Sequence, residues 1–229
     1  MKSWTRVLCL FLAALILAAA DFGIWQRDNL SPIIMGRLFS KEKLENRMQN
    51  LLEEQEKELA SKGVTVKGFT KSEIRKMLRG ELDEKAAKEL LKKKQQANDA
   101  KTKPAETKTV SDSPSAEAVL NECMARLYAY EGQLYSELGA AWQDAVNAWS
   151  STPIAQRTSA VKNQIKSESI NRCYNMEVTA DNRVSDILAE YREKIVAAGG
   201  NASDVDALWS VYCAKKSAVK AYYYSLVKT

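Results

Sequence analysis

The longest regular hydrophobic pattern lies in the second half of the chain. Between Ala116 and Ser150, apolar residues recur at steps of three and four, which is the period of one helix face. These positions are Leu120, Cys123, Leu127, Tyr130, Leu134, Leu138, Ala141, Ala145 and Trp149. Pro114 precedes the run and Ser151-Thr152-Pro153 follows it, so the pattern predicts one long helix between them.

Two further helices follow in the same half. The second is expected from Pro153 or Thr158 to Ala198, where Gly199-Gly200 is a typical helix stop. The third is expected from Asp204 to about Leu226. Because short connections make neighbouring helices antiparallel, residues 116–229 are predicted to form an all-α, three-helix, coiled-coil-like bundle of long antiparallel helices.

The predicted helices differ in length, and this difference points to a site. Counting from a reversal at Ser151, residues of the first two helices share a level when their numbers sum to about 304. The third helix would then end near the level of Tyr130, and residues 134–149 and 153–170 would project beyond it as a two-helix finger. The candidate partner-binding residues of the finger are Leu138, Trp142, Val146, Trp149, Val161 and Ile165. In the alternative interpretation Trp142 and Trp149 face the opposite helix, or the helix after Ser40 packs there.

The first half carries weaker helical patterns. An amphipathic helix is expected after Ser40, with Lys62-Gly63 at its end. Thr70-Lys-Ser-Glu73 matches a capping box, and Gly80 interrupts the helical pattern that resumes at Leu82. Residues 40–91 are therefore predicted to be a small N-terminal helical region, and a helical hairpin is favoured over a DNA-reading helix-turn-helix. We expect no nucleic-acid partner.

Residues 92–115 separate the two halves. Val110 is the only large apolar residue in this segment, which is rich in Lys, Gln, Thr, Ser, Pro and Asp. Such a composition cannot bury enough surface to offset the entropy of ordering. The segment is predicted to be a disordered linker, either a solvated tether or one whose Lys92–Lys94 cluster contacts an anionic polymer or lipid.

The beginning of the chain resembles an export signal. Lys2 and Arg6 are followed by fourteen uncharged residues, mostly apolar, from Val7 to Ala20. Residues 1–20 are therefore expected to be a cleaved signal peptide or, if residues beyond Asp21 extend the span, a signal anchor. Residues 21–39 are expected to be an irregular apolar approach segment. Both alternatives predict an extracytoplasmic protein, secreted or tethered to the membrane by its N-terminal segment.

The composition narrows the chemistry. The chain has 229 residues, a formal net charge of +5 and no histidine, so histidine-based nucleophile pairs and histidine-ligated metals are excluded. Phosphate-binding glycine loops and nucleophile-elbow motifs are also missing. We therefore expect no enzyme, no catalytic residue, no metal site and no cofactor.

Three cysteines would remain after removal of residues 1–20. The level count places Cys123 slightly nearer to Cys213, whereas the apolar stripes favour Cys123 with Cys173. Neither pair fits the reach of a disulfide well. The expected order is no intramolecular disulfide first, then Cys123–Cys213, then Cys123–Cys173.

These patterns favour a non-enzymatic exported structural or interaction module of a cell envelope. It would bind a protein partner or a second copy of itself by helix packing through the finger. The alternative is a module that binds wall polymer or anionic lipid, using Lys92–Lys94 and the tyrosines at 222–224.

Overall fold

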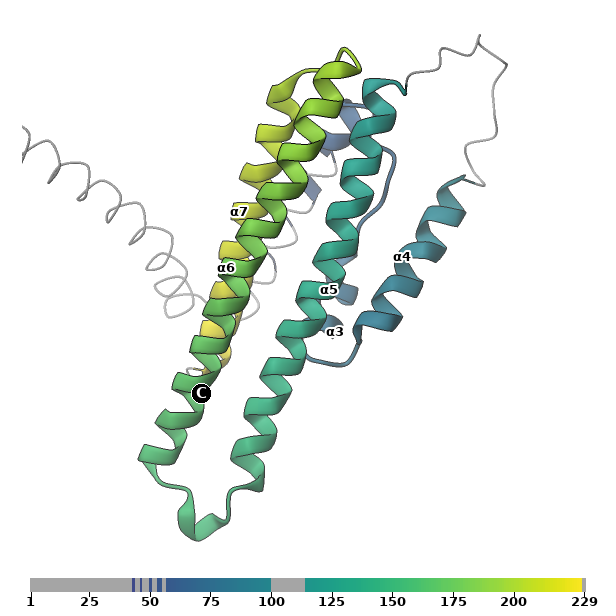
Figure 1. Ribbon diagram of the computed structural model, residues 1–229. Coiled ribbons are helices and arrows are strands. Elements are labelled where there is room, and N and C mark those ends of the chain that lie inside the picture. The colour runs from purple at the N-terminus through teal and green to yellow at the C-terminus, as the bar shows by residue number, and fades with distance from the viewer. Residues whose placement is uncertain are drawn as a thin grey trace, which may run out of the picture. The chain divides into compact units, whose positions relative to one another are not determined.

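Figure 1 shows the computed structural model, which describes residues 43, 46, 50, 53, 54, 57–99 and 114–227. These residues form helices and their connections, with no strand among them, so the expected all-α architecture is confirmed. The predicted signal or anchor at 1–20, the approach segment at 21–39 and residues 100–113 of the predicted linker lie outside the described residues. The chain divides into two compact units, Glu56–Trp209 and a second unit of Met1–Gln55 with Ser210–Thr229.

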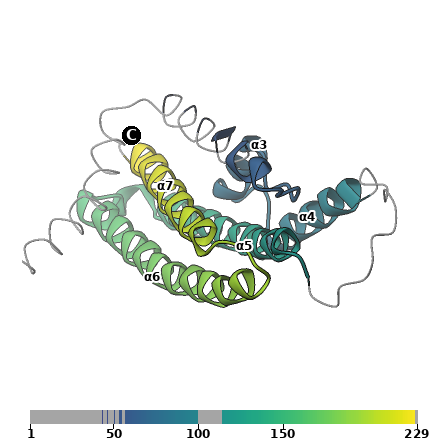
Figure 2. The same cartoon turned by 90° about the horizontal axis from the view of Figure 1, so that it is seen from above.

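The unit Glu56–Trp209 is built around one central helix. Its elements are α3 (Lys71–Leu78), α4 (Glu84–Asp99), α5 (Ala116–Ser151), the 3-10 turn η1 (Ile154–Gln156), α6 (Ser159–Ala197) and the beginning of α7 (Ala202–Val227). Helix α5 packs against α6 on one side and against α3 and α4 on the other, as Figure 2 shows. Two sides of α5 are therefore buried, not one.

Local geometry confirms several of the predicted helix ends. At the start of α3, the Thr70 N–H donates to the Glu73 carboxylate at 2.6 Å, and the Thr70 hydroxyl accepts from the Glu73 N–H. The three glycines expected at helix ends, Gly63, Gly80 and Gly199, have φ angles of 79°, 70° and 80°. Because L side chains rarely adopt this left-handed region, glycine ends these helices without strain.

Polar contacts fix the register of α5 against α6. Arg126 pairs with Glu190 at 2.5 Å, the Tyr191 hydroxyl donates to Glu122 at 2.7 Å, and Arg172 pairs with Asp144 at 2.6 Å. The count from Ser151 was wrong, because it placed residue 126 level with about residue 178. The chain reverses over Thr152–Thr158, which includes η1, so α6 begins later than the count assumed.

Glycines on α5 create the contact with the first half of the chain. A Cβ added at Gly139 would lie 1.9 Å from the Met77 carbonyl oxygen, and one added at Gly132 would lie 2.8 Å from the Phe69 ring. On the opposing segment, a Cβ at Gly68 would lie 2.4 Å from the Tyr128 ring. A backbone carbonyl approaches Gly139, and an aromatic ring approaches Gly132 and Gly68, this closely only because these positions carry no side chain.

Hydrogen bonds from α5 hold the same segment at both ends. The Asn121 carboxamide oxygen accepts from the Thr65 and Val66 N–H groups at 2.8 and 3.2 Å, and its amide donates to the Gly63 carbonyl at 3.1 Å. Further along α5, the Gln143 amide donates to the Arg79 carbonyl at 2.5 Å. The segment from Gly63 to Arg79 is thereby attached to α5 by specific polar contacts as well as by packing.

Helix α4 extends into the segment that was expected to be disordered. Residues 92–99 continue α4, which ends at Asp99. Lys94 stabilises this extension, since its ammonium group donates to the Gly68 carbonyl at 2.9 Å and pairs with Glu73 at 2.5 Å. The linker expected at 92–115 therefore begins no earlier than residue 100, and the domain boundary within 100–113 stays a prediction.

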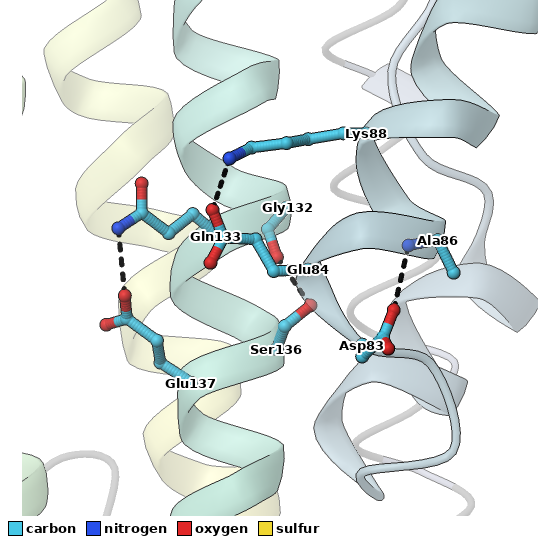
Figure 3. Close-up of polar contacts among 8 residues, drawn as sticks. All are labelled: Asp83, Glu84, Ala86, Lys88, Gly132, Gln133, Ser136 and Glu137. Atoms are coloured by element: carbon cyan, nitrogen blue, oxygen red, sulfur yellow. Dashed lines mark hydrogen bonds and ion pairs between the residues drawn. The ribbon is translucent and has the colours of Figure 1, made fainter.

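Figure 3 shows how polar groups are arranged where α4 faces α5. The Asp83 carboxylate accepts from the Ala86 N–H at 2.8 Å, which satisfies a backbone donor in the first turn of α4. The buried Ser136 hydroxyl donates to the Gly132 carbonyl one turn earlier on α5, at 2.8 Å. The Lys88–Glu84 ion pair lies along α4 itself. The polar groups drawn there bond within their own helix or its cap, and packing holds α4 to α5.

Ion pairs attach the beginning of α7 to other residues of the unit Glu56–Trp209. Asp204 pairs with Lys62 at 2.6 Å, and Asp206 pairs with Arg192 of α6. In the second unit, Ser210 to Val227 continue α7, with Val219 and Tyr222 buried and the Tyr222 and Tyr223 rings edge to face at 5.6 Å. That the third helix ends before the finger stays a prediction.

Candidate functional site: the finger of the α5–α6 hairpin

The structure places all six predicted finger residues in the hairpin formed by α5 and α6. Val146 is 41% exposed. The other five are half-buried: Leu138, Trp142, Trp149, Val161 and Ile165. The hairpin therefore covers part of the apolar row and leaves part of it in water. This result is intermediate between the two alternatives from the sequence, an exposed row and a covered one.

Val146 continues a buried row of α5. Tyr128, Tyr135 and Gly139 lie on the side of α5 that faces α3 and α4, and Val146 follows at the same helical spacing. The row loses its cover because α3 ends at Leu78 and the chain turns away at Gly80. Figure 1 shows α5 and α6 continuing well beyond α3 toward their connection. An internal packing surface thus extends into solvent.

Helix α6 carries a second exposed apolar row that the sequence analysis missed. Ile170, Tyr174 and Val178 are each more than two-fifths exposed and are spaced by four residues. This spacing places them on one helix face, outside the stripe that packs against α5. The signal was present in the sequence as an i, i+4, i+8 repeat, but it resembles an ordinary core stripe.

A shallow, open groove of about 560 Å³ lies between α5 and α6 at the base of the finger. Tyr130, Leu134 and Glu137 of α5 line one side, and residues from Glu168 to Thr179 of α6 line the other. Burial raises the pKa of the Tyr130 phenol, with a further increase from Glu137. The groove therefore combines a neutral phenol and the apolar Leu134 and Met176 with a mostly polar lining, which suits contact with a partner side chain.

The charges near the other end of α6 form a structural cluster. Lys194 and then Arg126 hydrogen-bond the Glu190 carboxylate and lower its pKa. Burial, followed by the hydrogen bond to Glu122, raises the pKa of Tyr191. The Lys194 ammonium lies 4.5 Å from the centre of the Tyr191 ring. Because each charge has a partner, this cluster ties α5 to α6.

The three described cysteines are thiols, and the Cys123–Cys213 disulfide considered in the sequence analysis is not present among the described residues. Cys123 is fully buried on α5, and burial raises the pKa of its thiol from 9.0 to about 12. Burial also raises the pKa of Cys173. Since the thiolate is the reactive form, neither group is suited to act as a nucleophile at neutral pH.

The residues of the alternative lipid- or polymer-binding site are only partly accessible. Lys92 and Lys93 are exposed, whereas Lys94 pairs with Glu73 and is mostly covered. Tyr222 is buried and Tyr223 is half-buried. The predicted residues therefore do not form one exposed surface, because only Lys92 and Lys93 are exposed among those that the structure describes.

Within residues 57–99 and 114–227, no group of His, Cys, Asp or Glu is arranged to hold a metal ion. None of the described helices is long and apolar enough to cross a membrane. Comparison with protein-family models, curated proteins and solved structures finds no match. The functional argument therefore depends on the residues of this chain.

Proposed function

We propose that the protein is a non-enzymatic helical interaction module of a cell envelope that binds a protein by helix packing on its finger. The partner is either another protein or a second copy of the chain. The observation that supports this proposal is the exposed Val146, which continues the α5 row that α3 and α4 cover elsewhere. A partner helix that follows this row would extend a packing surface that the protein already uses internally.

The energetic case rests on several modest contributions. Complete burial of a valine or isoleucine side chain contributes about 1.5–3 kcal/mol, and the finger side chains are already partly covered. Each would contribute roughly 1 kcal/mol when a partner covers the remainder. A stable complex therefore needs several of them together, and Val146 with the half-buried Trp142 and Trp149 provides such a group.

The location is proposed from the beginning of the sequence. The basic start and apolar run of residues 1–20 favour export, either with cleavage or with retention as a membrane tether. The second candidate function is binding of wall polymer or anionic lipid through the lysines after Leu91. The exposure of Lys92 and Lys93 favours it, whereas the pairing of Lys94 with Glu73 removes one charge from that surface.

Site-specific photo-crosslinking in cells that produce the full-length chain tests the leading proposal. A photoreactive side chain at position 146 is expected to form a defined adduct, and the adduct mass distinguishes a second copy from another protein. The control position is Glu193, which is exposed on α6 outside the finger, and it is expected to form no such adduct. Equal crosslinking at both positions, or none at position 146, would contradict the proposal.

A pair of charge substitutions, one inside the apolar contact and one beside it, tests the contact further. Val146→Asp is expected to abolish the adduct formed from a crosslinker at the neighbouring position 149, because it places a carboxylate in the apolar contact. Asn147→Asp adds the same charge at the next, exposed position and is expected to leave the adduct unchanged. High salt is expected to have little effect, whereas binding through Lys92 and Lys93 would weaken with salt.

A further inference from the structure

The connection between α5 and α6 has a composition unlike that of the rest of the unit. We propose that the tip, defined as residues 149–157, docks on an anionic phospholipid bilayer, with Ile154 inserted among the head groups and the basic residues around it facing lipid phosphates. This inference goes beyond the proposed protein contact and does not depend on it: Trp149 belongs to both regions, but Ile154 and the basic residues after it carry the inference.

Exposure is the first observation. Ile154 is 84% exposed, the highest value among the exposed large hydrophobic residues of the chain's described part. It lies in η1, directly after Pro153, and every residue from Pro153 to Ala160 is exposed. Figure 1 shows this connection at the far end of the hairpin from the start of α5. A branched apolar side chain is thus presented to solvent on a protruding turn.

Charge is the second observation. From residue 145 to residue 167 the chain contains no Asp or Glu, whereas it contains Arg157, Lys162 and Lys166. The nearest acidic residues on either side of this segment are Asp144, which pairs with Arg172, and Glu168. The end of the finger is therefore positively charged in a chain whose other helices mix both signs, and it complements an anionic surface.

The geometry of the tip is fixed before it meets a partner. Arg157 donates from Nε to the Thr152 carbonyl at 2.9 Å and from its terminal nitrogen to the Ser150 carbonyl at 2.8 Å. Its guanidinium lies 5.7 Å from the centre of the Trp149 ring. These bonds satisfy carbonyls at the end of α5 and hold the turn. Docking therefore costs little conformational entropy.

A bilayer fits these features better than the other anionic partners do. A soluble polyanion would pair with the lysines but would leave Ile154 in water. An acidic protein would need a preformed pocket for a protruding isoleucine. The head-group region of a bilayer accepts an apolar side chain, a cation and a tryptophan ring together, and anionic lipids attract each nearby Lys or Arg.

The test measures quenching of Trp149 fluorescence in the full-length chain by vesicles that contain brominated lipid. Vesicles of phosphatidylglycerol with phosphatidylcholine are compared with vesicles of phosphatidylcholine alone, and Trp149→Phe identifies the part of the signal that comes from this ring. Quenching of Trp149 is expected with the anionic vesicles and is expected to weaken as salt is raised. Because all variants carry the same N-terminal segment, any lipid contact of that segment is common to them.

Matched pairs of variants separate the two contributions. Ile154→Ser is expected to weaken binding on the order of ten-fold, whereas Ile170→Ser removes an exposed isoleucine outside the tip and is expected to have little effect. Lys162→Gln is expected to weaken binding about five-fold, whereas Lys85→Gln on α4 is the control for a lost charge. All four residues are at the surface, and unchanged helicity would confirm that each variant folds.

Three results would overturn the inference. The first is equal quenching of Trp149 by neutral and anionic vesicles, since it would remove the role of charge. The second is unchanged binding of Ile154→Ser, which would show that the tip does not insert. The third is binding of soluble polyphosphate that matches binding of vesicles in affinity, since that would identify a polyanion site with no need for a bilayer.

Discussion

The close approach of Gly139 to the Met77 carbonyl makes a definite prediction about stability. Gly139→Ala adds a single methyl group at a position where the Cβ would lie 1.9 Å from a carbonyl oxygen. Cβ atoms in proteins essentially never lie within 3.0 Å of a non-bonded heavy atom, so the backbone of α3 or α5 must move by at least 1.1 Å, the difference between the two distances. A backbone carbonyl cannot rotate away as a flexible side chain could.

The expected magnitude combines two opposing effects. Inserting a methyl group into a packed interface costs about 1–3 kcal/mol after partial relaxation. Alanine in place of glycine inside a helix recovers about 1 kcal/mol. We therefore expect a net destabilisation of up to about 2 kcal/mol. The displacement would fall on α3, whose Ile74, Met77 and Leu78 are almost completely buried.

Urea unfolding and amide hydrogen exchange measure the two parts of this prediction. Gly139→Ala is expected to lower the unfolding midpoint and to increase exchange of the α3 amides, with the amides of α6 less affected. Ala140→Gly at the neighbouring exposed position calibrates helix propensity and is expected to cost about 1 kcal/mol without changing α3. A Gly139→Ala protein that is more stable than the natural chain, with unchanged exchange in α3, would refute the proposed steric contact.

Two further predictions concern side chains of α5. Asn121→Ala is expected to lower the free energy of unfolding by about 1–2 kcal/mol in urea titration, because the Thr65 and Val66 N–H groups lose their acceptor; an Asn121→Asp protein that is no more stable than Asn121→Ala would contradict the role of that oxygen. Cys123 is expected to react with a thiol reagent only after unfolding. Because its pKa rises from 9.0 to about 12 on folding, it ionises first in the unfolded chain, so its contribution to stability is fully present below pH 9.0 and is lost as the pH rises toward 12. Cys123→Ala should show a weaker loss of stability over that range, and an identical pH dependence would contradict the burial argument.

The helices and several of their ends could be predicted from the sequence because they depend on local chemistry. The capping box at Thr70 and Glu73 and the stops at Gly63, Gly80 and Gly199 are confirmed in geometry. Each depends on residues within one helical turn, where the sequence order fixes the spatial order. Hydrophobic spacing likewise predicted α5 and α6, whose facing stripes are long enough to be unambiguous.

The second packing face of α5 could not be predicted in the same way. Its contacts with Phe69 and with α3 depend on Gly132 and Gly139 respectively, which have no side chain and leave no hydrophobic signal. The predicted register of α5 against α6 was also wrong, because the length of the Thr152–Thr158 connection cannot be read from the helical stripes. The contacts of Lys94 could not be predicted because its partners, Gly68 and Glu73, are distant in sequence.

The candidate site was predicted in part. The spacing of Leu138, Trp142, Val146 and Trp149 indicated an apolar row near the end of the hairpin, and the structure places these residues there. Spacing alone could not show that Val146 is the more exposed of them, since that depends on where α3 ends. The exposure of Ile154 was missed because it lies in a turn, where a periodic pattern has no meaning.

The two sides of α5 should tolerate sequence change to opposite degrees. On the side toward α6, large side chains fill the interface, and another apolar residue of similar volume can replace one of them at small cost. On the side toward α3, the space at Gly139 is already occupied by the neighbouring backbone, so each of the other nineteen amino acids is too large. The position that contributes least to a hydrophobicity profile is therefore the one where natural variation should be most restricted.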